Sequence, residues 1–425
     1  NRLRKTHWKT QLEHGIEFIP SNDFSFYDTT LDTAVLLNII PARYQKLNLS
    51  PLDTYFAMAR GYQGEAGDVK ALAMKKWFNT NYHYIVPELE DDTEIKISGD
   101  KLWSEYAEAK SIGIETKPVV TGAYTVLKLC RCTGNKTAAD YVDEIVNAYK
   151  DLIEKCEKEQ IAWIQFDEPA LVQDMEKEDI ELFHRLYDAI LTAVKDCKVL
   201  LQTYFGDVRD IYQDLIEMPF DGIGLDFLEG KETLQLIESY GFPKEKKLFA
   251  GLVNGKNIWK NHYEKTLKIL EKLQEKEIQT VLSTSCSLLH VPYTLKHETK
   301  LSKEYLAYFA FAEEKLTELK ELGDLAEDKK YFDREAYKKN HDLFAADRKC
   351  ENVAVKNRLS HVTEADYIRE PKRSERQKLQ KEAFGLPELP TTTIGSFPQT
   401  KDVKANRSAF RKGEITRQEY VDFNK

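Results

Sequence analysis

The sequence predicts an α/β protein whose main part, residues 1–325, is a (β/α)8 barrel of the TIM type. Three observations favour this fold. Short apolar runs alternate with helical patterns between Gly15 and Ser287, most of these runs are apolar at consecutive positions, and polar side chains follow directly after them. Strands buried on both faces of a parallel sheet have such runs, and the active site of a (β/α)8 barrel lies at the carboxyl ends of its strands.

Eight runs are candidate strands: residues 15–21 (GIEFIPS), 81–88 (NYHYIVPE), 117–122 (KPVVTG), 161–169 (IAWIQFDEP), 198–205 (KVLLQTYF), 221–227 (DGIGLDF), 247–255 (KLFAGLVNG) and 280–287 (TVLSTSCS). The polar residues at their ends are Asn22, Asp23, Glu88, Thr121, Asp167, Glu168, Thr203, Asp226, Asn254 and Cys286. In a barrel these side chains would open on one face. A doubly wound sheet shows the same alternation, but no GxGxxG motif follows any of the runs.

The segments between the strands have the spacing of amphipathic helices. Residues 137–156 are the clearest case, because Thr137 and Asp140 form a capping-box-like start. One face of this helix collects Tyr141, Ile145, Tyr149, Leu152 and Cys156. We therefore expect Cys156 to be a core residue.

The chain changes character after the last strand. Residues 301–325 read as a helix whose aromatic side chains pack back on the barrel. Residues 326–388 are dense in charged side chains, which is typical of a solvated, helical interdomain linker. In residues 389–425 a β-type run reaches Gly395 and a charged helix follows. A single strand and helix cannot bury a hydrophobic face, so this segment reads as the truncated first βα unit of a second barrel.

Composition limits the classes of partner. The chain has 62 basic and 71 acidic side chains, a net charge of −9, which argues against general nucleic-acid binding. No apolar run approaches the roughly 20 residues that a membrane helix needs. The first ten residues, NRLRKTHWKT, lack the apolar segment of a signal peptide. We expect a cytoplasmic protein, and a monomer.

Six cysteines in 425 residues are too few for a disulfide scaffold. Cys130 and Cys132 have no second pair of cysteines nearby in sequence to complete a metal site. Cys286 and His290 are close enough to share one strand end, but a catalytic zinc needs three protein ligands and no third is evident. We assign no metal ligands and no catalytic residues in this chain.

Five phrases in the barrel and one after it resemble, in the same order, the cobalamin-independent methionine synthase family. The phrases are IPSNDFSFYD (residues 19–28), MKKWFNTNYHYIVPE (74–88), FDEPALV (166–172), GLVNGKNIW (251–259), STSCSLLH (283–290) and TTTIGSFPQT (391–400). The resemblance covers nearly the whole chain. It implies two face-to-face barrels, of which this chain holds the first and the start of the catalytic second. The family carries one more strand before the first residue here, so residues 81–88 are either a barrel strand or an added hairpin strand.

The resemblance also implies a reaction. Members transfer a methyl group from 5-methyltetrahydropteroyl-polyglutamate to homocysteine, without cobalamin, and give methionine. Zinc holds the homocysteine thiolate, and its His, Cys and Glu ligands belong to the second barrel beyond this chain. A general acid there would protonate the leaving nitrogen. The chain would therefore supply the folate-side wall and be inactive alone.

Four residues match binding positions of the family. Lys76, in KWFNTNYHY, matches a lysine that contacts the folate, and Ile394, Gly395 and Ser396 match the segment that binds the amino-acid end of homocysteine. Asp167 and Glu168 could serve acid–base chemistry, but the first-barrel copy of their motif has no assigned task, and we interpret the pair as a structural relic. Cys286 and His290 receive the same interpretation.

Two other functions stay open. The chain could be a folate-binding or scaffolding barrel without catalysis. It could also be a stand-alone barrel of the uroporphyrinogen decarboxylase type, although that class ends after one barrel and a second one opens here at Thr391.

Overall fold

The computed structural model describes residues 1–346, 352–393, 395–396 and 399–425, and these fall into two compact units, Asn1–Ala346 (unit 1) and Asp347–Lys425 (unit 2). Ile394 therefore lies outside the described residues. Each unit is described by itself.

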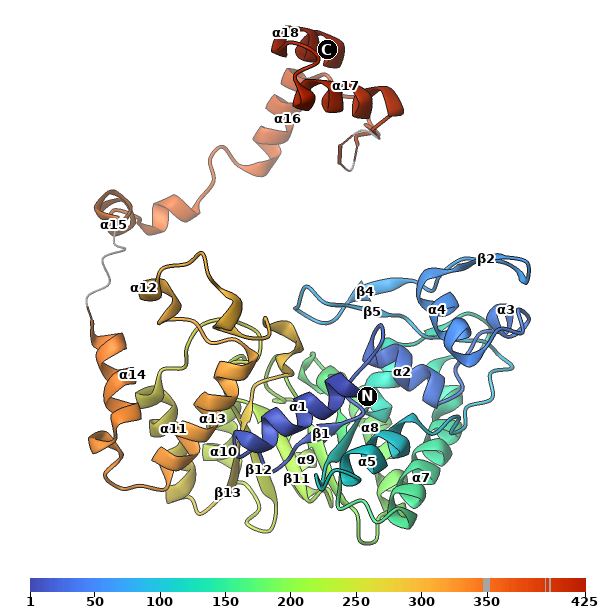
Figure 1. Cartoon of the computed structure of the whole chain (residues 1–425), viewed down its shortest axis with the longest axis vertical. Coiled ribbons are helices and arrows are strands. Elements are labelled where there is room, and N and C mark those ends of the chain that lie inside the picture. The colour runs from blue at the N-terminus through green and yellow to red at the C-terminus, as the bar shows by residue number, and fades with distance from the viewer. Residues whose placement is uncertain (347–351, 394, 397–398) are drawn as a thin grey trace. The chain divides into compact units, whose positions relative to one another are not determined.

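Unit 1 is built on a seven-stranded parallel sheet that curls through its centre (Figure 1). The strands pair in chain order: β1 (Pro20–Ser21), β7 (Lys117–Thr121), β9 (Trp163–Asp167), β10 (Lys198–Gln202), β11 (Gly222–Asp226), β12 (Lys247–Val253) and β13 (Gln279–Thr284). All seven lie within or overlap predicted runs. The α/β class and the parallel sheet are therefore confirmed. Among the described residues, β1 and β13 each pair with one strand only, so the sheet has two edges.

Helices alternate with the strands, and most of them surround the sheet (Figure 1). They are α1 (Arg2–Glu13), α2 (Thr29–Leu36), α3 (Ala42–Gln45), α4 (Pro51–Arg60), α5 (Lys101–Lys110), α6 (Ala123–Leu129), α7 (Val142–Lys158), α8 (Lys177–Ile190), α9 (Tyr212–Glu217), α10 (Thr233–Tyr240), α11 (Tyr263–Glu275), α12 (Lys303–Leu306), α13 (Ala312–Ala326) and α14 (Glu335–Ala345). A 3-10 turn precedes α7, and Thr137 and Asp140 form the predicted capping box there. Within the described part of the chain, none of the helices has the length and apolar character to cross a membrane.

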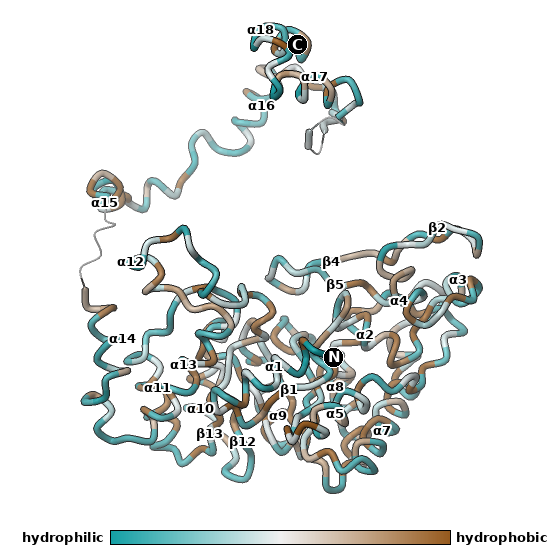
Figure 2. Tube along the Cα trace, in the orientation of Figure 1, coloured by the Kyte–Doolittle hydropathy of each residue, from teal (hydrophilic) through white to brown (hydrophobic). Residues whose placement is uncertain are grey.

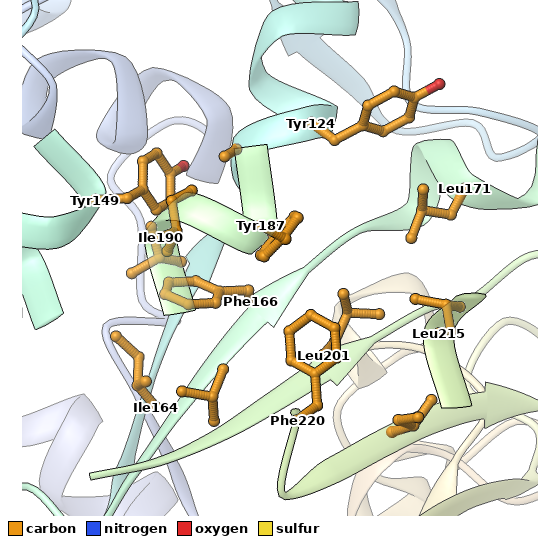
Figure 3. Close-up of a cluster of buried hydrophobic side chains, with 14 of the residues drawn as sticks. Tyr124, Tyr149, Ile164, Phe166, Leu171, Tyr187, Ile190, Leu201, Leu215 and Phe220 are labelled. Carbon is orange, nitrogen blue, oxygen red and sulfur yellow. The ribbon is translucent and has the colours of Figure 1, made fainter. Parts of the chain in front are cut away.

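The main core lies between the sheet and its helices (Figure 3). Phe166 of β9 packs between Tyr149 of α7 and Tyr187 of α8, with ring centroids 5.6 and 6.3 Å away. Cys156 is fully buried in this core, as its position on the apolar face of α7 predicts. The hydropathy-coloured tube shows the same arrangement, since apolar segments gather on the strands and inner helix faces (Figure 2).

Residues 81–88 do not form a strand of the main sheet. Instead β5 (His83–Ile85) pairs antiparallel with β4 (Met74–Lys76). The hairpin alternative is thus confirmed and the barrel-strand alternative is wrong. Two further short pairings lie outside the main sheet: β2 (Tyr62–Gly64) with β3 (Gly67–Val69), and β6 (Glu88–Leu89) with β8 (Arg131–Cys132).

The predicted helix over residues 301–325 is interrupted. A helix ends at Leu306 and the next begins at Ala312; Ala307 and Tyr308 form a turn between them, and Phe309 forms an isolated bridge with Trp259. The cause is a backbone pairing, because Ala310 N–H donates to the carbonyl of Ile258 at 2.8 Å and Lys260 N–H donates to that of Tyr308 at 2.8 Å. Periodicity alone does not reveal such long-range pairing.

Unit 2 contains α15 (Val353–Ser360), α16 (Arg373–Phe384), α17 (Lys401–Lys412) and α18 (Arg417–Asn424). None of its described residues is buried. The β-type run expected near Thr391 forms no strand in the part of unit 2 that the structure describes. A strand without a neighbour leaves its backbone groups unpaired, which explains this difference.

Candidate functional site

The first part of the site is the β4–β5 hairpin, which carries Lys76. Its connection begins with Trp77, whose N–H donates to the carbonyl of Tyr82 at 2.7 Å. The Thr80 hydroxyl donates to the carbonyl of Trp77 at 2.6 Å and accepts from Tyr82 N–H. Phe78 has a positive φ of 49°, a conformation that bends the connection and costs energy for a non-glycine residue. The polar residues in this aromatic-rich run therefore build the turn.

The connection and the second strand of the hairpin are fixed to unit 1 by packing. Trp77 and Tyr84 share an apolar cluster with Tyr204, Phe205 and Cys286. The last three residues lie just beyond the carboxyl ends of β10 and β13. Trp77 and Tyr84 meet edge to face, with ring centroids 5.7 Å apart. The hairpin consequently extends from the strand-end face of the sheet.

The tip of the hairpin is fixed by a ring of three polar side chains, Asn79, Glu229 and Lys256. Asn79 Nδ2 donates to Glu229 Oε2 at 2.6 Å, Lys256 Nζ donates to Asn79 Oδ1 at 2.9 Å, and Lys256 pairs with Glu229. Glu229 follows β11 and Lys256 follows β12. We call this ring the hairpin latch.

Lys76 is exposed on β4, opposite His83 in the antiparallel pair. Across the described ranges, no side chain forms an ion pair or hydrogen bond with the Lys76 ammonium. The group is thus free to contact an anionic ligand.

The second part of the site is a cavity of about 1110 Å³ that extends along the inner face of the sheet to its strand ends and is bordered by the two edge strands, β1 and β13. Its polar lining includes Lys117, Gln165, Asp167, Gln202 and Tyr204. They occupy alternate positions along β7, β9 and the strand-to-loop end of β10, so they share the inner face of the sheet. Burial raises the pKa of Asp167 to about 6 and lowers that of Lys117 to about 8.

Glu168 does not line this cavity. It is fully buried and accepts hydrogen bonds from Tyr124 N–H at 2.9 Å, Thr125 N–H at 2.7 Å, the Thr125 hydroxyl and the Tyr187 hydroxyl. A side chain at Gly122 would collide with its carboxylate, so the glycine makes room for it. Burial raises the pKa of Glu168 to about 7. These contacts suit a structural role that ties α6 and α8 to the end of β9.

Cys286 and His290 do not make a metal site. Burial raises the pKa of the Cys286 thiol to about 12. His290 lies against the rings of Tyr82 and Phe205, and burial lowers its pKa to about 4. The ranges that the structure describes contain no group of three His, Cys, Asp or Glu residues placed to hold a metal. Zinc therefore does not fit these residues.

The expected homocysteine segment belongs to unit 2. Gly395 and Ser396 are exposed and lie outside any helix or strand, and Ile394 is not among the described residues. Lys76 belongs to unit 1, so the structure describes the two expected binding regions separately.

Sequence reasoning missed the hairpin latch and Lys117. Lys117 could have been identified from the sequence. It lies at alternate positions of one strand with Val119 and Thr121, so the three side chains share a face, and a lysine is rare on the inner face of a sheet. The hairpin latch could not be predicted from a local sequence pattern, because its residues lie up to 177 positions apart in the sequence.

Known proteins share both parts of the chain. Sequence profiles described as "Cobalamin-independent synthase, N-terminal domain" and "Cobalamin-independent synthase, Catalytic domain" match residues 1–278 and 389–425. A protein of Campylobacter jejuni subsp. doylei named 5-methyltetrahydropteroyltriglutamate–homocysteine methyltransferase is 52% identical over 422 residues, 99% of this chain and 56% of that protein. A protein of the same name from Streptococcus gordonii is 51% identical over 421 residues, 99% of this chain and 55% of its own length.

The chain thus spans about half the length of these curated relatives. Among solved structures, a B12-independent methionine synthase from Shewanella in complex with selenomethionine matches with a TM-score of 0.50 at 16% identity, over 74% of this chain and 84% of that chain. This likeness concerns the fold. The matches with the two profiles and with these relatives together show that the chain belongs to the cobalamin-independent synthase family.

Proposed function

We propose that this chain is the folate-side part of a cobalamin-independent methionine synthase. The complete protein would transfer the methyl group of 5-methyltetrahydropteroyl-polyglutamate to the sulfur of homocysteine. The observation that carries the proposal is the 52% identity over 99% of this chain with a methyltransferase of that name. Lys76, which is exposed on a hairpin at the strand-end face and has no partner among the described residues, supports it, since an ammonium there can pair with a folate carboxylate.

The proposed architecture has residues 1–325 as a (β/α)8 barrel, residues 326–388 as an interdomain linker and residues 389–425 as the start of a second barrel. The parallel strand order supports the first assignment, because one further strand between β13 and β1 would close the sheet. The match of residues 389–425 with a catalytic-domain profile supports the last.

Zinc ligands and the proton donor would lie in the part of the relatives that this chain does not span. We accordingly propose that the chain alone neither transfers a methyl group nor holds stoichiometric zinc. The complete protein would act as a cytoplasmic monomer, without nucleic-acid partners. Metal analysis of the chain, with a transfer assay from 5-methyltetrahydropteroyl-triglutamate to homocysteine, tests this. Stoichiometric zinc together with turnover would place catalysis in unit 1.

Lys76 gives the sharper test. In the complete protein, Lys76→Ala should weaken binding of 5-methyltetrahydropteroyl-triglutamate roughly ten- to hundredfold, which is the usual effect of losing one charge-assisted contact. Lys75→Ala is the matched control, because Lys75 is also exposed but points to the opposite face of the same strand. Equal affinities of the two variants at low salt would exclude Lys76 from the folate site.

The alternative of a folate-binding barrel without catalysis makes a different prediction. It requires that the complete protein bind the folate and show no methyl transfer to homocysteine. The transfer assay on the complete protein separates the two functions.

A further inference from the structure

Over β7, β9 and the end of β10, the inner face of the sheet in unit 1 is polar where a barrel of this class normally packs branched apolar side chains. Lys117 of β7, Gln165 and Asp167 of β9, and Tyr204 after β10 all face the cavity. Burying such groups is costly unless they are paired, so their presence calls for a physical reason.

The four side chains form one chain of hydrogen bonds. Lys117 Nζ donates to Gln165 Oε1, and Gln165 Nε2 donates to Asp167 Oδ1 at 2.7 Å. The Tyr204 hydroxyl donates to Asp167 Oδ2 at 3.2 Å. The Gln165 amide is thereby held between an ammonium and a carboxylate, with each end facing the group it can bond.

Both charged groups keep unused bonding capacity. An ammonium has three N–H donors, and in the described part of the chain Lys117 uses one. Each Asp167 oxygen accepts one hydrogen bond and has a second lone pair. The remaining donors and acceptors border the cavity, which is where a ligand would meet them.

The spacing of the two charges indicates the ligand. One amide group and its two hydrogen bonds separate Lys117 from Asp167. The backbone of a free α-amino acid has a similar reach, with an ammonium at one end and a carboxylate at the other. Trp77, Phe249 and Val281 supply an apolar part of the cavity wall, which suits an uncharged side chain.

We propose that the strand-end cavity of unit 1 binds a free α-amino acid with an uncharged side chain, its ammonium on Asp167 and its carboxylate on Lys117. The residues of this site belong to unit 1, whereas the expected homocysteine segment around Ser396 belongs to unit 2, and the site does not depend on the proposed methyl transfer. Gln165 and Tyr204 hold the Asp167 carboxylate in place.

Calorimetric titration of the chain with L-methionine tests the proposal. We expect saturable binding of one equivalent. 3-(Methylthio)propylamine lacks the carboxylate and 4-(methylthio)butanoic acid lacks the ammonium, so each should bind ten- to hundredfold more weakly. Binding of either analogue as tight as that of methionine would refute the two-charge site. This comparison needs no variant and so does not depend on mutant folding.

Variants then locate the site. Asp167→Asn and Lys117→Met should each weaken methionine binding at least tenfold. Lys198→Met is the matched control, since Lys198 opens the neighbouring strand β10 but is exposed outside the cavity, and it should bind as the parent does. Ser396→Ala should also bind normally. Absence of saturable binding in the parent chain would overturn the proposal. Binding that survives Asp167→Asn and Lys117→Met but fails in Ser396→Ala would overturn it too, and would place the ligand in unit 2.

Discussion

Two adjacent carboxylates at the end of β9 have different surroundings. Asp167 faces the cavity, while Glu168 points the other way and is enclosed by α6 and α8. Consecutive residues of an extended chain place their side chains on opposite sides, which accounts for the difference. The shared motif therefore combines one residue available to a ligand with one that holds the fold together.

Glu168 should make stability depend on pH. Its pKa rises from 4.5 to about 7 through burial, so its contribution to stability is fully present below pH 4.5 and is lost as the pH rises through 7. Between these limits the loss is about 3 kcal/mol. Glu168→Gln should remove this part of the slope, as urea unfolding at pH 4.5 and pH 8 would measure. The exposed Glu178→Gln is the control and should keep the parent slope. An unchanged slope in Glu168→Gln would show that Glu168 does not titrate in this range.

Asp28 should be the most costly helix cap to remove. Its buried carboxylate accepts from Thr30 N–H at 2.8 Å and Leu31 N–H at 3.3 Å at the start of α2, and from Ile85 N–H at 3.0 Å on β5. Asp28→Ala should lower the free energy of unfolding by roughly 2–4 kcal/mol, since it removes a cap and leaves a buried donor unpaired. Ser50→Ala removes an exposed cap of α4 and should cost about 1 kcal/mol. If Asp28→Ala and Ser50→Ala lowered the free energy of unfolding equally, the hydrogen bond from Ile85 N–H would contribute nothing to stability.

At the scale of the elements, the β4–β5 hairpin is tied to unit 1 through its connection and its second strand. Trp77 and Tyr84 pack in an apolar cluster of unit 1, and the latch of Asn79, Glu229 and Lys256 closes at the tip. Short two-stranded hairpins are marginally stable alone, so these ties define where Lys76 lies.

Breaking the latch should loosen the hairpin. Asn79→Ala removes the residue that bonds both other members, and amide hydrogen exchange across residues 74–85 should accelerate. Asn81→Ala is the matched control, because the Asn81 side chain bonds nothing in the described ranges, and its exchange should equal that of the parent. Exchange that is the same in all three proteins would show that packing of Trp77 alone holds the hairpin.

The sequence predicts the main-sheet elements well because their signals are local. The apolar run of 161–169 contains β9, that of 221–227 contains β11, and Thr137 with Asp140 marks the start of a helix. Two features depend on backbone pairing between separate segments: the break in the predicted helix near Phe309, and the pairing of residues 81–88 in a hairpin. The hydrophobic periodicity of a single segment does not predict such pairing. For the site, Lys76 could be named from a motif, whereas the contacts of Lys117 and Asn79 arise only when separate strands come together.

At the scale of the whole molecule, the two units differ in what stabilises them. Unit 1 has an extensive core built from strands and helices, and unit 2 has no buried residue among those described. Its helices are 8 to 12 residues long, and isolated helices of this length are marginal in water. The two units should therefore not unfold as one cooperative body.

Limited proteolysis should separate them. Trypsin should cut first within residues 352–393, where Lys and Arg are frequent and helices α15 and α16 bury no side chain, and should leave unit 1 intact. Within unit 2, α17 and α18 should resist longer, because Phe410 and Tyr420 stack with ring centroids 4.7 Å apart and Asn406 Nδ2 donates to the carbonyl of Tyr420. Mass spectrometry of the early fragments measures both the site of first cleavage and the slower cleavage of α17 and α18. Tyr420→Ala should make trypsin cleave α17 and α18 as fast as α15 and α16, and should leave unit 1 uncleaved as in the parent. Cleavage inside unit 1 at the same rate as in unit 2 would contradict this account, because it would mean that the sheet core is no more stable than helices without one.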